Sequence, residues 1–502
     1  MSKKTVYDKL VDWFDERLGF AKAPLKPIPD FALNPIYWLG LLMALTFGMQ
    51  GATGMFMLLY YVPTPAEAYS STTYIINSVP LGQLVETLHL YTAYAMILIA
   101  FLHLARNYFG SAHKEKRVLM WLAGIVLGVT VLGFGVTGYL LPWTVISKSA
   151  TDVAVGFVNF FPASIANLAK FVLVGSGSDA AEITNFLHIH TVMLPAILLV
   201  FLALKVYMYE VHGPAYISAF GKPKKGKIYP WFPKIFLYAV ILFTTFIALL
   251  VAVSALVPLV LPPAFSPETA GQYVVQPDWY LLWVYQILKI QAFEGSAAIY
   301  GIGAVIAFIV ILFLLPFYDR SKRRAMSKRP VFVTVGAIIV VEFITLTVWG
   351  YLTPGQIIAN QDAVLVLGGS IVATIIVTWL LYRLYRLRRK TPATILPASE
   401  NKAPTAPAAK KPEPSAKEQP AQARDKIKQA SQSMLSWFTA IFVFFLIVAS
   451  ASLASLVNMI PRLLEAAPLV FLSAAVFVGS LYAMCRMLRG YVLAYEKQRG
   501  IT

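Results

Sequence analysis

The chain has 502 residues, of which 58% are hydrophobic and only 13% are charged, and its formal net charge is +18. A soluble protein of this length would need several domains with polar surfaces, which this composition does not supply. The repeated apolar stretches of about 20 residues are long enough to cross a bilayer as helices. The predicted fold class is therefore an all-α polytopic membrane protein, with the lipid bilayer as its solvent.

The positive charge lies in short loops between the apolar stretches, which is typical of membrane topology and argues against nucleic acid as a partner. The single cysteine, Cys485, excludes a disulfide framework, a Cys-plus-His metal cluster and covalent haem attachment. Residues 1–30 are amphipathic and charged and show no signal-peptide pattern.

Ten membrane spans are predicted in chain order. They cover residues 35–61, 87–108, 118–140, 190–211, 233–260, 298–318, 331–351, 364–386, 434–458 and 466–488. Lys and Arg gather after the even-numbered spans, as in "HKEKR" and "GKPKKGK", whereas loops 62–86 and 352–363 contain neither residue. This asymmetry predicts a multi-pass protein of the cell membrane with both termini in the cytosol and the long loops 141–189 and 261–297 outside.

The chain is interpreted as five regions: an amphipathic cytosolic N-terminus (1–30), a four-helix bundle (31–215), four further spans (216–390), a tether (391–430) and a terminal transmembrane hairpin (431–502). The tether is rich in Pro, Ala, Lys and Gln without apolar periodicity, which predicts a disordered cytosolic segment.

Two spans carry pairs of nitrogen-bearing side chains. His89 and His103 are 14 positions apart in the second span. At about 100° and about 1.5 Å per residue, the two imidazoles share one helix face and lie about 21 Å apart. In the fourth span His190 is followed 15 positions later by Lys205, about 60° round the helix and again broadly on one face. A lysine inside a span suggests a function, because a free ammonium there is costly.

The first and third spans carry glycines at the same interval: Gly40 with Gly54, and Gly124 with Gly138. A lone intramembrane His is more often a hydrogen-bonded core residue, and a lone glycine pair more often serves close helix packing. Four helices that share one spacing favour a different interpretation, because glycine lets a bulky group approach the backbone. The pattern predicts two flat macrocycles stacked across a four-helix bundle, each held axially by groups from the second and fourth spans.

Several motifs resemble the cytochrome b of the quinol-oxidising cytochrome bc family over residues 30–386. They are "GYLLPW" (138–143), "HTVMLP" (190–195), which favours His190 over His188 as a ligand, Arg106 three residues after His103, and "PDWY" (277–280). The resemblance implies two non-covalent haems of b or a type. His89 and His190 would hold the outer haem, and His103 and Lys205 the inner haem.

The resemblance also implies quinol oxidation at an outer site. Asp278 is the expected proton acceptor, because a partly buried carboxylate has a raised pKa and can cycle near neutral pH. Tyr280 and Tyr139 are expected to bind or pack against the quinol ring, and Pro277 and Trp279 to shape the loop. Taken alone, the motif is better interpreted as an ordinary Pro-Asp turn with interfacial aromatics, and the ligand pattern of the bundle is what favours the quinol site.

The implied partners are quinol and quinone, a Rieske iron–sulfur protein as the second electron acceptor, and a dimeric complex. The chain itself lacks the cysteine set of an iron–sulfur cluster. A fused assembly with terminal oxidase subunits stays open, as do the haem type and the quinone species.

Arg106 matches a residue that pairs with a haem propionate in the family.

The sequence departs from the family pattern in four places. Lys205 replaces a haem histidine, and neutral-amine ligation, a snorkelling side chain and absence of the inner haem all stay open. Glu86 and Asn185 stand where arginines are usual, and Asp278 replaces a glutamate. The segment "KIYPWFPKIF" lacks the acidic residue of an inner quinone site, for which His212 is a candidate. These departures and the extra hairpin suggest an archaeal or otherwise divergent member.

Two other functions fit parts of the pattern. A transporter could use intramembrane His and Lys as a proton relay, but no internal repeat is visible. A dihaem anchor of a dehydrogenase would exchange electrons with quinone, but would not need the PDWY loop or the fifth to eighth spans.

Overall fold

The computed structural model describes residues 6–18, 27–216 and 227–390. The predicted tether (391–430), the terminal hairpin (431–502) with its two spans, and Cys485 lie outside the described residues. Within them the regular structure is helical apart from two isolated bridges and one two-residue strand pairing, in which Ile28 of β1 (Ile28–Pro29) lies opposite Tyr229 of β2 (Ile228–Tyr229).

The helices follow one another along the chain with short connections. They are α1 (Val6–Leu18), α2 (Leu39–Leu58), α3 (Ala68–Ser78), α4 (Gly82–Phe109), α5 (Val118–Leu140), α6 (Val145–Gly156), α7 (Ala163–Leu173), α8 (Asp179–His188), α9 (Leu194–His212), α10 (Phe236–Leu256), α11 (Pro267–Ala270), α12 (Leu282–Leu288), α13 (Ala298–Tyr318), α14 (Pro330–Leu352) and α15 (Asn360–Lys390).

Eight helical segments in the described part are long and apolar enough to cross a membrane. They confirm the all-α polytopic fold and the first eight predicted spans. The fourth span differs most, because α8, a π turn and α9 form one helical segment over Asp179–His212. Its start was missed because the first turn is polar: Ser178 caps it by accepting from the Ala181 N–H, and Asp179 and Glu182 follow.

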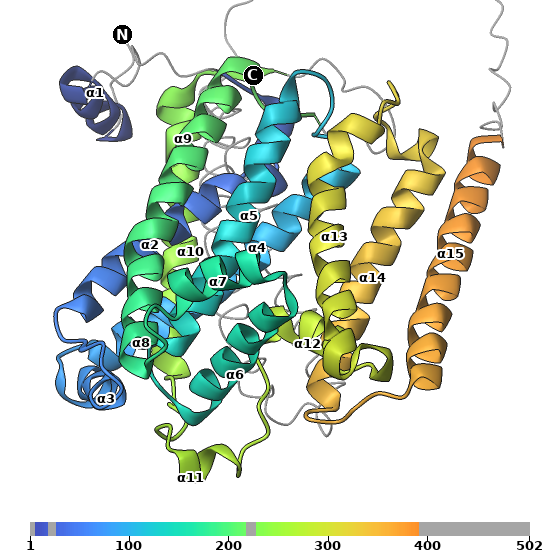
Figure 1. The fold of residues 1–502 in the computed structure, drawn as a ribbon. Helices are drawn as coiled ribbons and strands as arrows, with labels where there is room; N and C mark the ends of the chain where they lie inside the picture. The colour runs from blue at the N-terminus through green and yellow to red at the C-terminus, as the bar shows by residue number, and fades with distance from the viewer. Residues whose placement is uncertain (1–5, 19–26, 217–226, 391–502) are drawn as a thin grey trace, which may run out of the picture.

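The first four spans form a bundle in which α2 packs on α4, α5 packs on α9, and α4 contacts α5. Figure 1 shows α10 behind this bundle and α13, α14 and α15 beside it, with α15 at the edge. The bundle centre is apolar, with Ile97, Val131 and Leu198 buried in one cluster. In a bilayer these side chains stabilise the bundle through close van der Waals packing, because lipid tails are as apolar as the side chains themselves.

The two ends of the bundle differ. At one end α4 begins, α5 ends and the short helices α3, α6, α8, α11 and α12 gather (Figure 1). This end is called the PDWY end, because residues 277–280 lie there. At the other end, the basic-loop end, α4 leads into α5 through "HKEKR".

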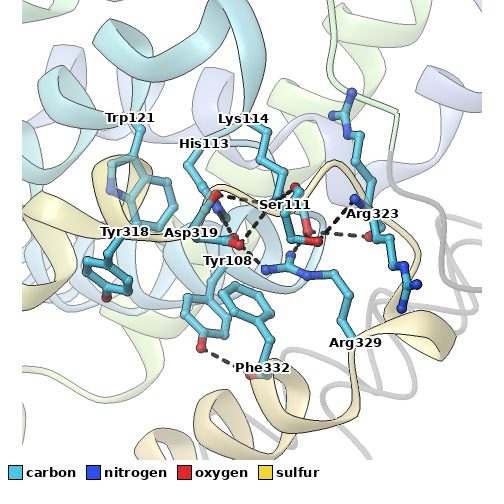
Figure 2. A network of polar contacts seen from close by, with 12 residues as sticks. Tyr108, Ser111, His113, Lys114, Trp121, Tyr318, Asp319, Arg323, Arg329 and Phe332 are labelled. Carbon is cyan, nitrogen blue, oxygen red and sulfur yellow. Dashed lines mark hydrogen bonds and ion pairs between the residues drawn. The ribbon is translucent and has the colours of Figure 1, made fainter.

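A buried polar network at the basic-loop end ties the α4–α5 connection to the α13–α14 connection (Figure 2). Asp319 accepts from His113 Nε2 at 2.6 Å and from Lys114 Nζ at 2.9 Å, and is also paired with Arg329. Burial acts to raise the pKa of Asp319, but the bonds from Lys114, His113 and Arg329 outweigh it and hold the pKa below its usual value. Burial lowers the pKa of His113 to about 4.

Candidate functional site

Toward the PDWY end, two of the predicted ligands lie against two of the predicted glycines. A Cβ atom added at Gly54 would lie 3.4 Å from His89 Cε1, and one added at Gly138 would lie 2.7 Å from His190 Cε1. The second distance is shorter than real Cβ contacts, so any larger residue at position 138 would force the His190 ring to move.

The same arrangement recurs toward the basic-loop end. A Cβ atom at Gly40 would lie 3.3 Å from His103 Cε1, and one at Gly124 would lie 2.9 Å from Lys205 Nζ. His103 and Lys205 also interact electrostatically. The amine of Lys205 therefore points across to α5 inside the bundle. The sequence predicted the spacing of these eight residues, and the structure adds which glycine faces which ligand.

Two threonines orient the ligands toward the PDWY end, and sequence analysis missed both. Thr53 Oγ1 lies 2.8 Å from His89 Nδ1, and Thr137 Oγ1 lies 3.0 Å from His190 Nδ1. Each hydroxyl donates its one proton to the carbonyl four residues earlier at 2.8 Å. It therefore accepts from the imidazole, so Nδ1 carries the hydrogen and Nε2 keeps its lone pair for a metal. The only sequence signal was a Thr-Gly dipeptide at 53–54 and 137–138.

The pair toward the basic-loop end lacks this orientation. Leu39 and Ala123 stand before Gly40 and Gly124, where the other pair has threonines. Among the described residues, Nδ1 of His103 is buried without a hydrogen-bond partner. A buried, unsatisfied imidazole nitrogen is unusual in a structural core and is common at functional sites.

A π turn over Ile189–Met193 holds His190. Pro195 has no N–H to pair with the carbonyl four residues earlier, and the Leu194 N–H instead bonds to the Ile189 carbonyl, five residues back.

The wide turn also explains the unequal ligand spacing. Because it takes up one extra residue, the fifteen-residue interval from His190 to Lys205 acts like about fourteen α-helical residues. His190 and Lys205 thus have the same helical phase as His89 and His103. The angle between them around the helix is smaller than the predicted offset of about 60°.

The PDWY loop places a carboxylate against α4. Tyr94 of α4 donates a hydrogen bond of 3.0 Å to Asp278 Oδ1, and Tyr280 also bonds Asp278. Burial raises the pKa of Asp278 to about 6 in spite of these two bonds. Tyr139 of α5 interacts electrostatically with the same carboxylate. Sequence analysis missed Tyr94, because nothing in its own segment distinguishes it from a core aromatic.

The aromatic residues of the loop close this part of the site. Tyr280 is only 2% exposed, and a Cβ atom at Gly135 would lie 2.7 Å from its hydroxyl. The Trp279 ring stands edge-on to Tyr94, with ring centroids 6.3 Å apart. Pro277 is half-buried at the start of the turn.

The remaining candidates lie around the bundle. Arg106 stacks its guanidinium 4.4 Å above the Tyr37 ring, and its Nε is buried without a hydrogen-bond partner among the described residues. His188 faces away from the bundle, where it lines a surface hollow of about 230 Å³ together with Asn185. His212 ends α9 and binds Arg117 through its backbone carbonyl at 3.1 Å. Glu86 is half-buried on α4.

The fold and site define a class of protein: a helical membrane protein whose first bundle presents two stacked pairs of nitrogen ligands beside a buried acid. The family model described as cytochrome b/b6/petB matches residues 26–213, and that described as cytochrome b(C-terminal)/b6/petD matches residues 268–367. The chain belongs to the cytochrome b family, as its motifs predicted.

Known relatives agree with this assignment. The chain is 31% identical to cytochrome b of Sulfolobus acidocaldarius over 78% of its own length and 74% of that protein. It is 30% identical to the cytochrome bc complex cytochrome b subunit of Chlorobaculum thiosulfatiphilum, over 69% and 82% of the two chains. A solved chain of a hyperthermophilic respiratory complex III matches with a TM-score of 0.57 and 25% identity, over 74% of this chain and all of that one.

Haem is the cofactor of this family, and the bundle residues fit it on three observations. A glycine faces each of the four ligands and lets its side chain approach the neighbouring backbone closely. The threonines fix the tautomer that leaves Nε2 of His89 and His190 available for iron. His103 and Arg106 hold buried polar atoms that no described residue satisfies. The chain is thus an electron-transport protein of the membrane.

Proposed function

We propose that this chain is the cytochrome b subunit of a bc-type respiratory complex that oxidises quinol at the PDWY end. The observation that carries the proposal is the hydrogen bond between Tyr94 and Asp278. It joins the half-buried acid of the loop to α4 at a point five residues, or about 7.5 Å along the helix axis, from His89, so the proton acceptor lies near the first electron carrier.

Two non-covalent haems are proposed, one held by His89 and His190 and the other by His103 and Lys205. Haem iron supplies a carrier that takes and gives one electron at a time. Lys205 would bind through the lone pair of its neutral amine, which the apolar surroundings favour over the ammonium. The position of Nζ beside Gly124 supports ligation over a side chain that snorkels to the membrane surface. Arg106 is proposed to pair with a propionate.

Quinol oxidation releases two protons and two electrons and leaves quinone. Asp278 is proposed to accept one proton from a quinol hydroxyl, because its pKa of about 6 lets it take up and release a proton near neutrality. Tyr280 and Tyr139 shape the ring pocket, with Pro277 and Trp279 closing it. One electron enters the bundle, and the other goes to a separate subunit, because the chain has a single cysteine. By family, that subunit is a Rieske protein in a dimeric complex.

The PDWY end is proposed to face outside and the basic loops to face the cytosol. Protons would then leave outside while electrons move inward, which builds a transmembrane potential. An inner quinone site near His212 would complete the path, although "KIYPWFPKIF" offers no acidic side chain there.

The test is spectroscopy of the complex purified from its native membranes. Quinol should reduce the haems and an external one-electron acceptor in equal amounts, and a potentiometric titration should resolve two haem components. A colourless complex, as expected of a transporter, would overturn the proposal. The proposal would also be overturned if quinol reduced the haem equally well with and without the external acceptor, as expected of a dehydrogenase anchor.

A further inference from the structure

The carboxylate of Asp278 is held by two hydroxyl groups, one from a membrane span and one from its own loop. Tyr94 donates from α4 at 3.0 Å, and Tyr280 bonds it from the adjoining turn. Aspartate has a short side chain, so the orientation of its carboxylate depends on the donors that reach it. Tyr94 is the donor that belongs to a membrane span and not to the loop itself.

Tyr94 is itself fixed by packing. Its ring lies edge-on to Trp279 and tilted against Tyr280, with centroids 6.3 and 6.4 Å away. It sits five residues after His89, about one and a half turns along α4. The position of the Tyr94 hydroxyl along the bundle is thus fixed, and the Asp278 carboxylate of the loop binds to it there.

We propose that Tyr94 is a positioning residue of the quinol site, which holds the Asp278 carboxylate in the bundle and sets the pH range over which it accepts the substrate proton. The inference rests on the proposed function. It adds a span residue that sequence motifs do not mark, and it assigns that residue a role distinct from binding substrate.

The physical basis is the direction in which the hydrogen bond from Tyr94 shifts the pKa of Asp278. A hydroxyl that donates to a carboxylate stabilises the charged form and lowers the pKa of the acid. Burial raises the pKa of Asp278 to about 6, and the Tyr94 and Tyr280 bonds oppose that rise. Removal of the Tyr94 hydroxyl should therefore move the pKa further upward. Because Asp278 must be unprotonated to accept a proton, activity should then be lost at a higher pH.

The other groups around Asp278 do not offset this effect. Tyr139 faces it from α5, and Tyr280 donates from its own turn. The elements packed on the loop have their charged and hydroxyl groups engaged elsewhere: Glu342 of α14 with Ser370, Tyr285 of α12 with the Gly355 N–H, and Lys289 with Thr353. Among the described residues near Asp278, Tyr94 is thus the donor whose removal tests the proposal most directly.

The experiment compares pH–rate profiles of quinol oxidation by the whole complex with Tyr94→Phe and, as a matched control, Tyr91→Phe. Tyr91 lies one turn earlier on α4 with its ring centroid 6.3 Å from that of Tyr94, but its hydroxyl donates to the Val257 carbonyl at 2.9 Å, so it controls for the loss of a neighbouring tyrosine hydroxyl. The acid limb is the part of the profile in which the rate falls as pH decreases. In Tyr94→Phe it should shift to higher pH by about one unit, the scale of a hydrogen bond to a charged group. The rate at low pH should fall about tenfold, with the haem spectra unchanged. Tyr91→Phe should retain the normal profile.

A second variant should shift the acid limb in the opposite direction. It retains the hydroxyl of residue 94, so the result does not depend on whether the protein folds without that group. A 3-fluorotyrosine at position 94 is a stronger donor, so the acid limb should move to lower pH. An acid limb that stays in place in both variants would overturn the inference. If Asp278→Asn still removes activity in that case, the proposed function stands. If the unmodified complex does not oxidise quinol at all, the proposed function itself fails.

Discussion

The hydroxyl of Thr137 on α5 lies 3.0 Å from Nδ1 of His190 on the π turn between α8 and α9. Thr53 makes the equivalent contact to His89 from α2. Each predicted ligand toward the PDWY end thus takes its orientation from a helix other than its own. Such contacts fix the tautomer and raise the basicity of a metal-bound imidazole.

Thr137→Val should weaken haem binding toward the PDWY end by about 10–100-fold, the usual effect of losing an orienting partner. Any haem that remains should show a raised midpoint potential, because a less basic imidazole stabilises the oxidised iron less. Thr130→Val is the control: Thr130 is buried on the same helix and bonds only the Val126 carbonyl at 2.9 Å. Potentiometric titration of both variants measures the change, and identical curves would contradict it.

Gly138→Ala should remove or displace the same haem, because the new methyl group would lie 2.7 Å from His190 Cε1. Gly128→Ala, on the same helix with open space at its Cβ position, should retain both haems and should not weaken α5, since alanine favours the helix by about 1 kcal/mol. Haem content per polypeptide distinguishes them. A normal haem content in Gly138→Ala would show that this close approach is not needed.

Lys205→Leu should abolish the low-spin spectrum of the second haem while that held by His89 and His190 stays normal. Leucine is apolar and offers no donor atom, so iron would lose one axial ligand, whereas methionine could bind iron through its sulfur. Lys205→His should be the mildest replacement, because imidazole is the usual nitrogen ligand in the family. Electron paramagnetic resonance resolves the two haems. An unchanged second signal in Lys205→Leu would exclude ligation by this residue.

Asp278→Asn should lower quinol oxidation by about 10² or more, the scale of a lost general base, with normal haem spectra. The sign of the pH dependence follows from the raised pKa: the unmodified rate should fall as pH drops through about 6, where Asp278 becomes protonated. The variant should lack this limb, because the amide does not titrate. Steady-state turnover between pH 5 and pH 8 tests both points, and full activity in the variant would remove Asp278 from the mechanism.

Asp319→Asn should destabilise the junction at the basic-loop end by about 3 kcal/mol, because it leaves Lys114 and Arg329 buried without their counter-ion. The pKa of Asp319 is held below its usual value, so its contribution is present at neutral pH and is lost only as pH falls below about 4. Asp362→Asn, at an exposed position on α15, is the control. Thermal unfolding in detergent at pH 7 should show a lowered midpoint for the first variant only.

The sequence by itself determined the membrane class, eight of the spans within the described residues, and the helical phase of His89 and His103. These features depend on local periodicity: a run of apolar residues fixes a span, and a fixed rotation per residue places His89 above His103 on one face. The motifs also identified the family. The polar first turn of α8 escaped detection, because hydropathy does not distinguish an amphipathic helix start from a loop.

Only the tertiary structure decided which residues meet across helices. These contacts join positions that are 36 to 184 residues apart in the sequence. They are the contacts of Thr53 and Thr137 with the histidines, of Lys205 with Gly124, and of Tyr94 with Asp278. Their partners depend on how far each helix is shifted and rotated against the next. That register is set by packing of the whole bundle and, on the fourth span, by one π turn, so no single segment contains it.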